Sequence, residues 1–306
     1  MDSRLNEWED KTRLMIRDSE LILNPDGSIY HLCLLPEDLA DIVITVGDPD
    51  RVEKVSRHFD RLELSKENRE FRTHTGYLAD KRISVVSTGI GPDNIDIVSN
   101  ELDALVNIDF KTRQVKSVLK QLKLIRIGTS GGLQPNLPLD SMVYSAYALG
   151  FDNLLYYYQG GDKEHVPILR SFLEDTEWEE SNIPRPYVSR GSKTLALSLG
   201  MDEIQNGFTA TNVGFYGPQG RNLRLLPSDG QLLDRLSRFQ YQDLRILNLE
   251  METAAIYGMA QLLGHQAVSL SVILANRSSG TFSDDPESAI SDLIRFTLDR
   301  IIKSDI

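Results

Sequence analysis

Three glycine-containing segments each follow a short apolar run and combine small residues with arginine or hydroxyl groups. They are residues 47–51 (Gly-Asp-Pro-Asp-Arg), 87–91 (Ser-Thr-Gly-Ile-Gly) and 126–132 (Arg-Ile-Gly-Thr-Ser-Gly-Gly). Glycine lets a backbone approach a ligand closely, and arginine presents a fork of donors to an oxyanion. Any one of them could be an ordinary tight turn. Together they favour a site for a free phosphate, with Arg51, Arg126 and Thr129 as donors.

A fourth segment, residues 215–221 (Phe-Tyr-Gly-Pro-Gln-Gly-Arg), carries groups that could recognise a planar imide. An imide N–H needs an acceptor and its two carbonyls need donors. Gln219 offers both kinds of group and Arg221 offers donors only. Phe215 could cover a sugar or a base. The alternative is a solvent-exposed loop.

Two carboxylates, Glu250 and Glu252, stand where an apolar run gives way to a helical pattern. Residues two apart face the same side while the chain is extended, so both could accept hydroxyl groups of one polyol. They could equally be acids that the N-terminus of a helix favours. Asn276 and Arg277 end the last long apolar run, and these two polar residues could simply terminate the strand.

The elements that must position these residues alternate along the chain. Short apolar runs rich in β-branched residues predict strands that are buried on both faces. They cover residues 42–46, 83–86, 122–127, 142–148, 208–212, 244–249 and 268–274. Segments of helical period lie between them, which predicts an α/β fold: a single domain with a mixed central sheet and helices on both faces.

Three helices are predicted from apolar stripes and start signals. Asp93 is expected to cap the first, another follows Glu250, and one ends the chain. Residues 1–30 are interpreted as an N-terminal arm or short helix and residues 31–306 as the domain. Residues 109–121 and 159–190 are interpreted as insertions, the second as a polar surface excursion.

Composition narrows the class of protein. The 306 residues are 41% hydrophobic and 25% charged, which is typical of globular proteins. A net charge of −12 disfavours binding to nucleic acid or to an anionic membrane. The one cysteine, Cys33, excludes an internal disulfide and is expected to be a buried apolar residue. No membrane span or signal peptide is recognised, so a cytoplasmic protein is expected.

In their order along the chain, these motifs resemble the nucleoside phosphorylase family, which has the phosphorylase/hydrolase fold, and within it the uridine phosphorylase branch. The resemblance begins near His31 and continues to the C-terminus. It rests on residues 47–51, 69–71 (Arg-Glu-Phe), 89–91, 126–131, 215–221, 250–252 and 276–277.

The resemblance implies phosphorolysis of a nucleoside to a free base and ribose 1-phosphate, and it assigns roles by motif. Phosphate would be held by Gly47, Arg51, Arg126, Thr129 and, from a neighbouring subunit, Arg69. Ribose would contact Phe215, Glu250, Met251, Glu252 and, across the same interface, His31. The base would contact Phe215, Gln219, Arg221 and Asn276. The catalytic set would be Arg51, Arg126, Thr129, Arg221 and Glu252.

Substrate, cofactor and assembly follow as expectations. Purine-specific relatives carry an aspartate at the position of Asn276 to protonate the purine, so asparagine favours uridine. Inorganic phosphate is the implied co-substrate, with no organic cofactor and no metal in the site. Some relatives bind a monovalent cation at a dimer interface partly through a serine, which the Pro92-Asp93 sequence here lacks. The family forms homo-oligomers, either dimers or hexamers.

Three alternatives remain open at this stage. A purine or broad-specificity phosphorylase would use the same fold and the same phosphate site. A nucleoside hydrolase of this fold would replace phosphate by water and would not need Arg51, Arg69 or Arg126. A catalytically silent binding protein would be expected to have lost some of the charged ligand contacts.

Overall fold

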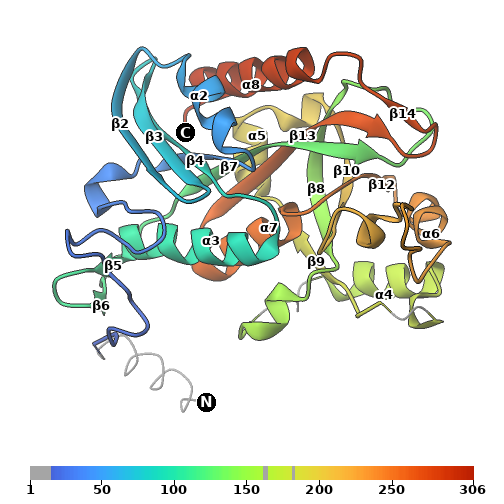
Figure 1. The fold of residues 1–306 in the computed structure, drawn as a ribbon, viewed down its shortest axis with the longest axis horizontal. Coiled ribbons are helices and arrows are strands. Elements are labelled where there is room, and N and C mark those ends of the chain that lie inside the picture. Colours follow the sequence, from blue (N-terminus) through green and yellow to red (C-terminus); the bar gives the residue numbers. More distant parts are fainter. Residues whose placement is uncertain (1–14, 161–164, 181–182) are drawn as a thin grey trace.

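The computed structural model describes residues 15–160, 165–180 and 183–306. Within them, twelve strands form one mixed sheet in which β11, β12, β10, β8, β13, β7, β1, β4, β3 and β2 are successive neighbours. The expected α/β fold is confirmed (Figure 1). The strands are β1 (Ile42–Val46), β2 (Arg61–Asn68), β3 (Phe71–Leu78), β4 (Lys81–Ser87), β7 (Lys123–Gly132), β8 (Met142–Gly150), β9 (Tyr187–Arg190), β10 (Gln205–Thr211), β11 (Gln240–Tyr241), β12 (Leu244–Glu250), β13 (Gln266–Asn276) and β14 (Thr281–Phe282).

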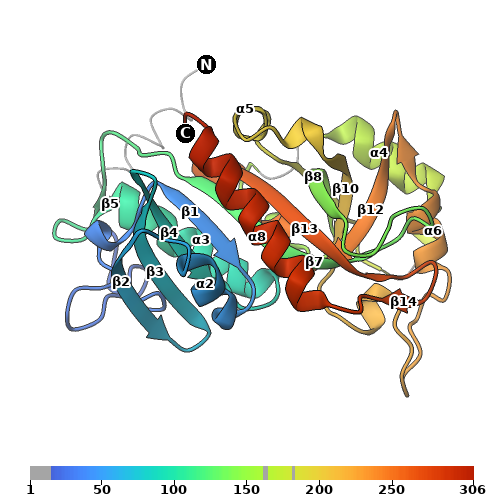
Figure 2. The ribbon, with the colours of Figure 1, turned by 90° about the horizontal axis from the view of Figure 1, so that it is seen from above.

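Helices cover both faces of the sheet. Helix α8 crosses one face, whereas α3 and α7 lie on the other (Figures 1 and 2). The α-helices are α2 (Pro49–Ser56), α3 (Pro92–Asn107), α4 (Val166–Asp175), α5 (Lys193–Ser198), α6 (Leu232–Arg238), α7 (Thr253–Leu263) and α8 (Pro286–Lys303). No helix in the described part of the chain is long and apolar enough to span a bilayer.

The apolar stripes of two predicted helices are buried as expected. In α3 the stripe is Ile95, Val98, Leu102 and Leu105, and in α8 it is Ile290, Ile294, Leu298 and Ile301. The expected cap of α3 is wrong, because the helix begins at Pro92, two residues before the start that a cap at Asp93 would give. Gly91 is the N-cap with φ of 102°, and proline suits the first helical position because its missing N–H would have no partner there.

Strand β7 is longer than its apolar run predicts. It continues through residues 128–132, where the glycine-rich sequence had suggested a loop. Strand β13 pairs with β7 as far as Gly132, and β12 pairs with Gly131 and Gly132 in the antiparallel sense. These two neighbours supply the ladder hydrogen bonds, so the segment stays extended despite the low strand propensity of glycine. The same pairing brings the end of β12 alongside the end of β7.

The β2–β3 hairpin was not predicted. Strand β2 lies at an edge of the sheet and is mostly exposed, so its charged sequence lacks the apolar signal of a buried strand. Arg69 lies in the turn of this hairpin with φ of 56°, in the left-handed region.

The described part of residues 159–190 is not only a surface excursion. Ile168, Leu169 and Phe172 of α4 and Trp178 are buried in a core cluster with strand β10 and helix α6. Strand β9 of this segment pairs with β8. Residues 109–121 contain β6 (Gln114–Val115), which pairs with β5 (Ile108–Asp109) in a separate hairpin.

The N-terminal boundary also differs from expectation. Residues 1–14 lie outside the described residues, but Leu21 and Ile29 are buried in the main core cluster, so this part of the expected arm belongs to the domain. The expected burial of Cys33 is wrong in degree, because the residue is half-buried; its backbone has φ of 52°.

Candidate active site

A cavity of about 660 Å³ lies where β1, β7 and β12 end, and is called here the central cavity. This is within the usual size range of small-ligand sites. The sequence-predicted residues that line it are Gly47, Arg51, Arg126, Thr129, Phe215, Gln219, Arg221, Glu250, Met251 and Glu252. The fold therefore brings together ten of the residues that had been assigned to phosphate, ribose and base.

Arg51 reaches one end of the central cavity from the first turn of α2. The helix begins after Asp48, whose side chain accepts a hydrogen bond from the Asp50 N–H at 3.0 Å, with Pro49 in the first turn. The Arg51 guanidinium is buried and donates to the Ile127 carbonyl at 3.3 Å. Burial lowers the pKa of Arg51, and Asp48 partly opposes this. This arrangement leaves most of its donors available to an anion.

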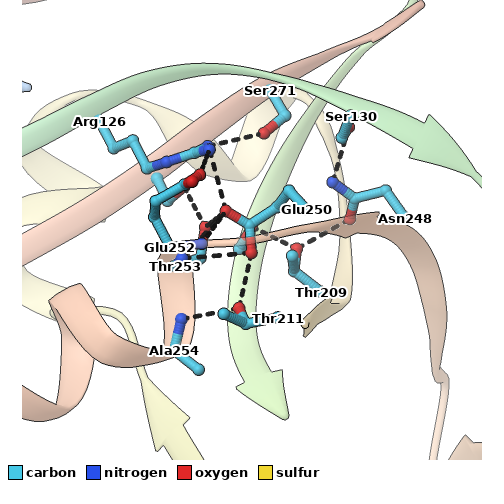
Figure 3. Close-up of polar contacts among 12 residues, drawn as sticks. Arg126, Ser130, Thr209, Thr211, Asn248, Glu250, Glu252, Thr253, Ala254 and Ser271 are labelled. Atoms are coloured by element: carbon cyan, nitrogen blue, oxygen red, sulfur yellow. Dashed lines mark hydrogen bonds and ion pairs between the residues drawn. The ribbon is translucent and has the colours of Figure 1, made fainter. Parts of the chain in front are cut away.

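Arg126 contacts both carboxylates and Ser271 (Figure 3). Its Nη2 is 2.6 Å from Glu252 Oε2 and 2.9 Å from Glu250 Oε2, and its Nη1 donates to Ser271 Oγ at 3.2 Å. Burial alone would lower the pKa of Arg126, but the two carboxylates outweigh it and raise the pKa. A permanently charged arginine therefore separates two acids that would otherwise repel each other.

Gly128 makes room for that guanidinium. A Cβ atom at this position would lie 1.9 Å from Arg126 Nη1 and 2.4 Å from its Cζ. Thr129 follows on the same strand, half-buried, and faces the cavity. Gly128 thus allows the Arg126 guanidinium to lie close to the backbone of β7, and the segment is a strand rather than a flexible loop.

Glu252 keeps hydrogen-bonding capacity toward the cavity. Its Oε1 accepts the Gly91 N–H at 2.9 Å, and its Oε2 is paired with Arg126. Burial raises the pKa of Glu252, and Arg126 opposes the shift. Because a carboxylate can accept about four hydrogen bonds, Glu252 can still accept from a ligand hydroxyl.

Gln219 and Arg221 are held as one unit at the other end of the central cavity. Arg221 Nη1 donates to Gln219 Oε1 and to the Phe215 carbonyl, both at 2.6 Å, and its Cζ lies 3.7 Å from the centre of the Phe215 ring. Burial and, to a lesser extent, nearby Arg277 lower the pKa of Arg221 to about 10. Arg221 is therefore still charged at neutral pH.

Asn276 is not among the cavity-lining residues. Its amide donates to the carbonyls of Gln134 and Leu137 at 3.0 and 2.8 Å, and its Oδ1 accepts the N–H groups of Ser278 and Ser279. Arg277 had no assigned role, and the structure shows that it donates to the Gly220 carbonyl at 3.3 Å and so contacts the 215–221 loop.

His31 and Arg69 lie together outside the central cavity. His31 Nδ1 is 2.6 Å from Glu101 Oε1, and the Asn68 side chain donates to the His31 carbonyl at 2.8 Å. Arg69 is exposed, and its guanidinium is 5.9 Å from the centre of the Tyr30 ring. The fold does not bring either residue to the cavity of its own chain.

Several cavity-lining residues had no role in the sequence analysis. Glu70, Asn94, Ser130 and Phe282 are among them. Glu70 follows Arg69 in the unpredicted hairpin, so no sequence signal placed it here. Among the described residues, no group of three or more His, Cys, Asp or Glu side chains could hold a metal ion.

Comparison with known proteins places this chain in a family. Residues 41–302 match the model of the Phosphorylase superfamily. A uridine phosphorylase of Thermococcus kodakarensis is 30% identical over 260 residues, covering 84% of this chain and 80% of that protein. A DeoD-type purine nucleoside phosphorylase of Listeria welshimeri is 25% identical, covering 87% of this chain and 96% of that protein.

A solved structure, described as a Trypanosoma brucei nucleoside phosphorylase that shows uridine phosphorylase activity, has a TM-score of 0.82 and 28% identity. It covers 93% of this chain and 100% of that chain. The chain belongs to the Phosphorylase superfamily. Its relatives are nucleoside phosphorylases, so the resemblance stated from the sequence is confirmed.

Proposed function

We propose that this pentosyltransferase is a uridine phosphorylase, which converts uridine and inorganic phosphate to uracil and ribose 1-phosphate. The observation that carries the proposal is that three kinds of group line one cavity. Arg51, Arg126 and Thr129 can donate to an anion, Gln219 and Arg221 can pair with the edge of an imide, and Glu252 can accept from hydroxyl groups. Relatives named uridine phosphorylase support this choice.

Cleavage of a glycosidic bond passes through an oxocarbenium-like transition state. A phosphate dianion held by Arg51, Arg126 and Thr129 would stabilise the positive sugar and then form the new bond to C1′. Glu252 would accept hydroxyl hydrogen bonds of the ribose, with Met251 and Phe215 packing against it. Arg126 contacts Glu252 directly, so one guanidinium orients both the phosphate site and the ribose site.

The leaving uracil takes the electron pair of the glycosidic bond and becomes an anion. Arg221 beside a uracil carbonyl would bind this anion more strongly than the neutral substrate, which lowers the barrier. Gln219 would complete recognition of the imide edge. No side chain then has to protonate the base, and this favours uracil over a purine leaving group.

The assay that tests this function measures free-base release from uridine and from inosine, each with and without inorganic phosphate. We expect phosphate-dependent release of uracil and much slower release of hypoxanthine. Hypoxanthine as the main product would overturn the assignment of Gln219 and Arg221. Base release without phosphate would identify a hydrolase and would remove the roles of Arg51 and Arg126.

We also propose that each site is completed by a second copy of the chain. His31 and Arg69 lie near each other, are not among the residues that line the central cavity, and have the chemistry to bind a ribose 5′-hydroxyl and a phosphate. In a symmetric dimer the partner subunit's His31 and Arg69 would reach the first subunit's cavity, and the reverse.

Mixing two impaired variants tests this arrangement. Arg69→Ala and Arg51→Ala should each be nearly inactive alone. In a mixed dimer one cavity has its own Arg51 and receives an intact Arg69, so co-expression should restore about one quarter of wild-type activity with random pairing. If Arg69 served its own cavity, mixing would restore nothing.

A further inference from the structure

Glu250 is the last residue of β12, and donors surround its buried carboxylate (Figure 3). Its Oε1 accepts the Thr211 hydroxyl at 2.6 Å. Its Oε2 is 2.9 Å from Arg126 Nη2 and accepts the Glu252 N–H at 3.0 Å and the Thr253 hydroxyl at 2.9 Å. The Thr253 N–H donates to both oxygens, at 3.2 and 2.9 Å.

These contacts occupy all the hydrogen-bond acceptor positions of the Glu250 carboxylate. Two oxygens provide about four lone-pair positions, and Glu250 has at least as many donors within hydrogen-bond distance. Among the described residues, the carboxylate of Glu252 has two partners, the Gly91 N–H and Arg126. Although both acids line the central cavity, only Glu252 has acceptor capacity left for a ribose hydroxyl.

We propose that Glu250 is a positioning residue rather than a ribose ligand. It holds the Arg126 guanidinium in place and fixes the N-terminus of α7 through Thr253. The inference rests on the proposed nucleoside site and divides the two carboxylates by role. Glu252 touches the sugar, and Glu250 acts through Arg126.

Thr211 contributes to the same hydrogen-bond network around Glu250. It ends β10, immediately before the segment that carries Phe215, Gln219 and Arg221. Its hydroxyl donates to Glu250 and accepts the Ala254 N–H of α7 at 2.9 Å. One hydroxyl therefore joins the base-recognition loop, the carboxylate behind the ribose site and the helix that follows it.

The distinguishing experiment compares Glu250→Gln with Glu252→Gln on uridine, 2′-deoxyuridine and 3′-deoxyuridine. A ribose ligand discriminates between a substrate that has the hydroxyl and one that lacks it. Glu252→Gln should therefore reduce the preference for uridine by about tenfold or more, about 1.4 kcal/mol. Glu250→Gln should lower activity on all three nucleosides by a common factor, with their ratios kept within about twofold, and should raise KM for phosphate. A loss of discrimination in Glu250→Gln that matches Glu252→Gln would overturn the proposal.

Thr211 supplies a matched pair of variants. Thr211→Val keeps the side-chain shape but leaves Glu250 Oε1 and the Ala254 N–H without their hydroxyl partner. Thr211→Ser keeps the hydroxyl. We expect Thr211→Val to raise KM for phosphate by about tenfold and Thr211→Ser to remain within about threefold of wild type. Equal values in the two variants would refute the role of the hydroxyl.

Phosphate binding measured by calorimetry separates this proposal from the proposed function, because it needs no turnover. Glu250→Gln should weaken binding of inorganic phosphate to the free protein whichever nucleoside is cleaved. Unchanged phosphate affinity in folded Glu250→Gln would contradict the positioning role. Absence of uracil release from the wild-type protein would instead refute the function.

Discussion

Replacing Arg126 with alanine should abolish phosphorolysis and destabilise the protein in the same step. The guanidinium is buried between Glu250 and Glu252, and it also serves the anion end of the cavity. Its removal leaves two buried carboxylates without their counter-ion, which typically costs about 3–5 kcal/mol of stability. We expect kcat/KM to fall by about 10³-fold or more, because a preorganised cation is lost from the reacting centre.

Arg51→Ala is the matched control for the Arg126 substitution. Arg51 is also buried and lines the same cavity, but within the described part of the chain its guanidinium donates to a backbone carbonyl, that of Ile127, rather than to a carboxylate, and burial lowers its pKa. The fold therefore disfavours the charge on Arg51, and removing it should change the free energy of unfolding by less than about 1 kcal/mol.

Urea denaturation and steady-state kinetics of the two variants separate these effects. Both variants should lose activity and show a raised KM for phosphate, but only Arg126→Ala should lose substantial stability. Equal destabilisation of the two variants would mean that Arg126 is not needed to stabilise the buried pair of Glu250 and Glu252.

The class of the fold could be predicted because its central strands have a strong local signal. Buried parallel strands are continuous β-branched runs, and β1 matches its predicted bounds. The β2–β3 hairpin could not be found in this way, since an edge strand owes its structure to pairing with a neighbour. The extension of β7 through its glycines likewise depends on β12 and β13, which are far away in the sequence.

The sequence could predict those cavity-lining residues that follow directly after an apolar strand. Most of residues 47–51 and 126–132, together with Glu252, line one cavity because β1, β7 and β12 end near one another. The sequence could not divide the roles of Glu250 and Glu252, because the donors that saturate Glu250 come from β7, β10 and α7. It also could not place Asn276, whose four partners are all backbone groups.

The second large effect is expected from Arg221→Ala, which should lower kcat/KM for uridine by about 10²–10³-fold through kcat. Arg221 donates a hydrogen bond to Gln219 Oε1 at 2.6 Å, and its pKa of about 10 leaves it charged at neutral pH.

If Arg221 stabilises the departing uracil anion, the substitution should lower kcat/KM for 5-fluorouridine much less than for uridine, because fluorine already stabilises that anion. KM for phosphate should stay within about threefold of wild type, since Arg51 and Arg126 lie at the other end of the cavity. A decrease in kcat/KM of less than about threefold, worth about 0.7 kcal/mol, would refute the role of Arg221. An equal loss on uridine and 5-fluorouridine would show that Arg221 orients the base without stabilising its charge.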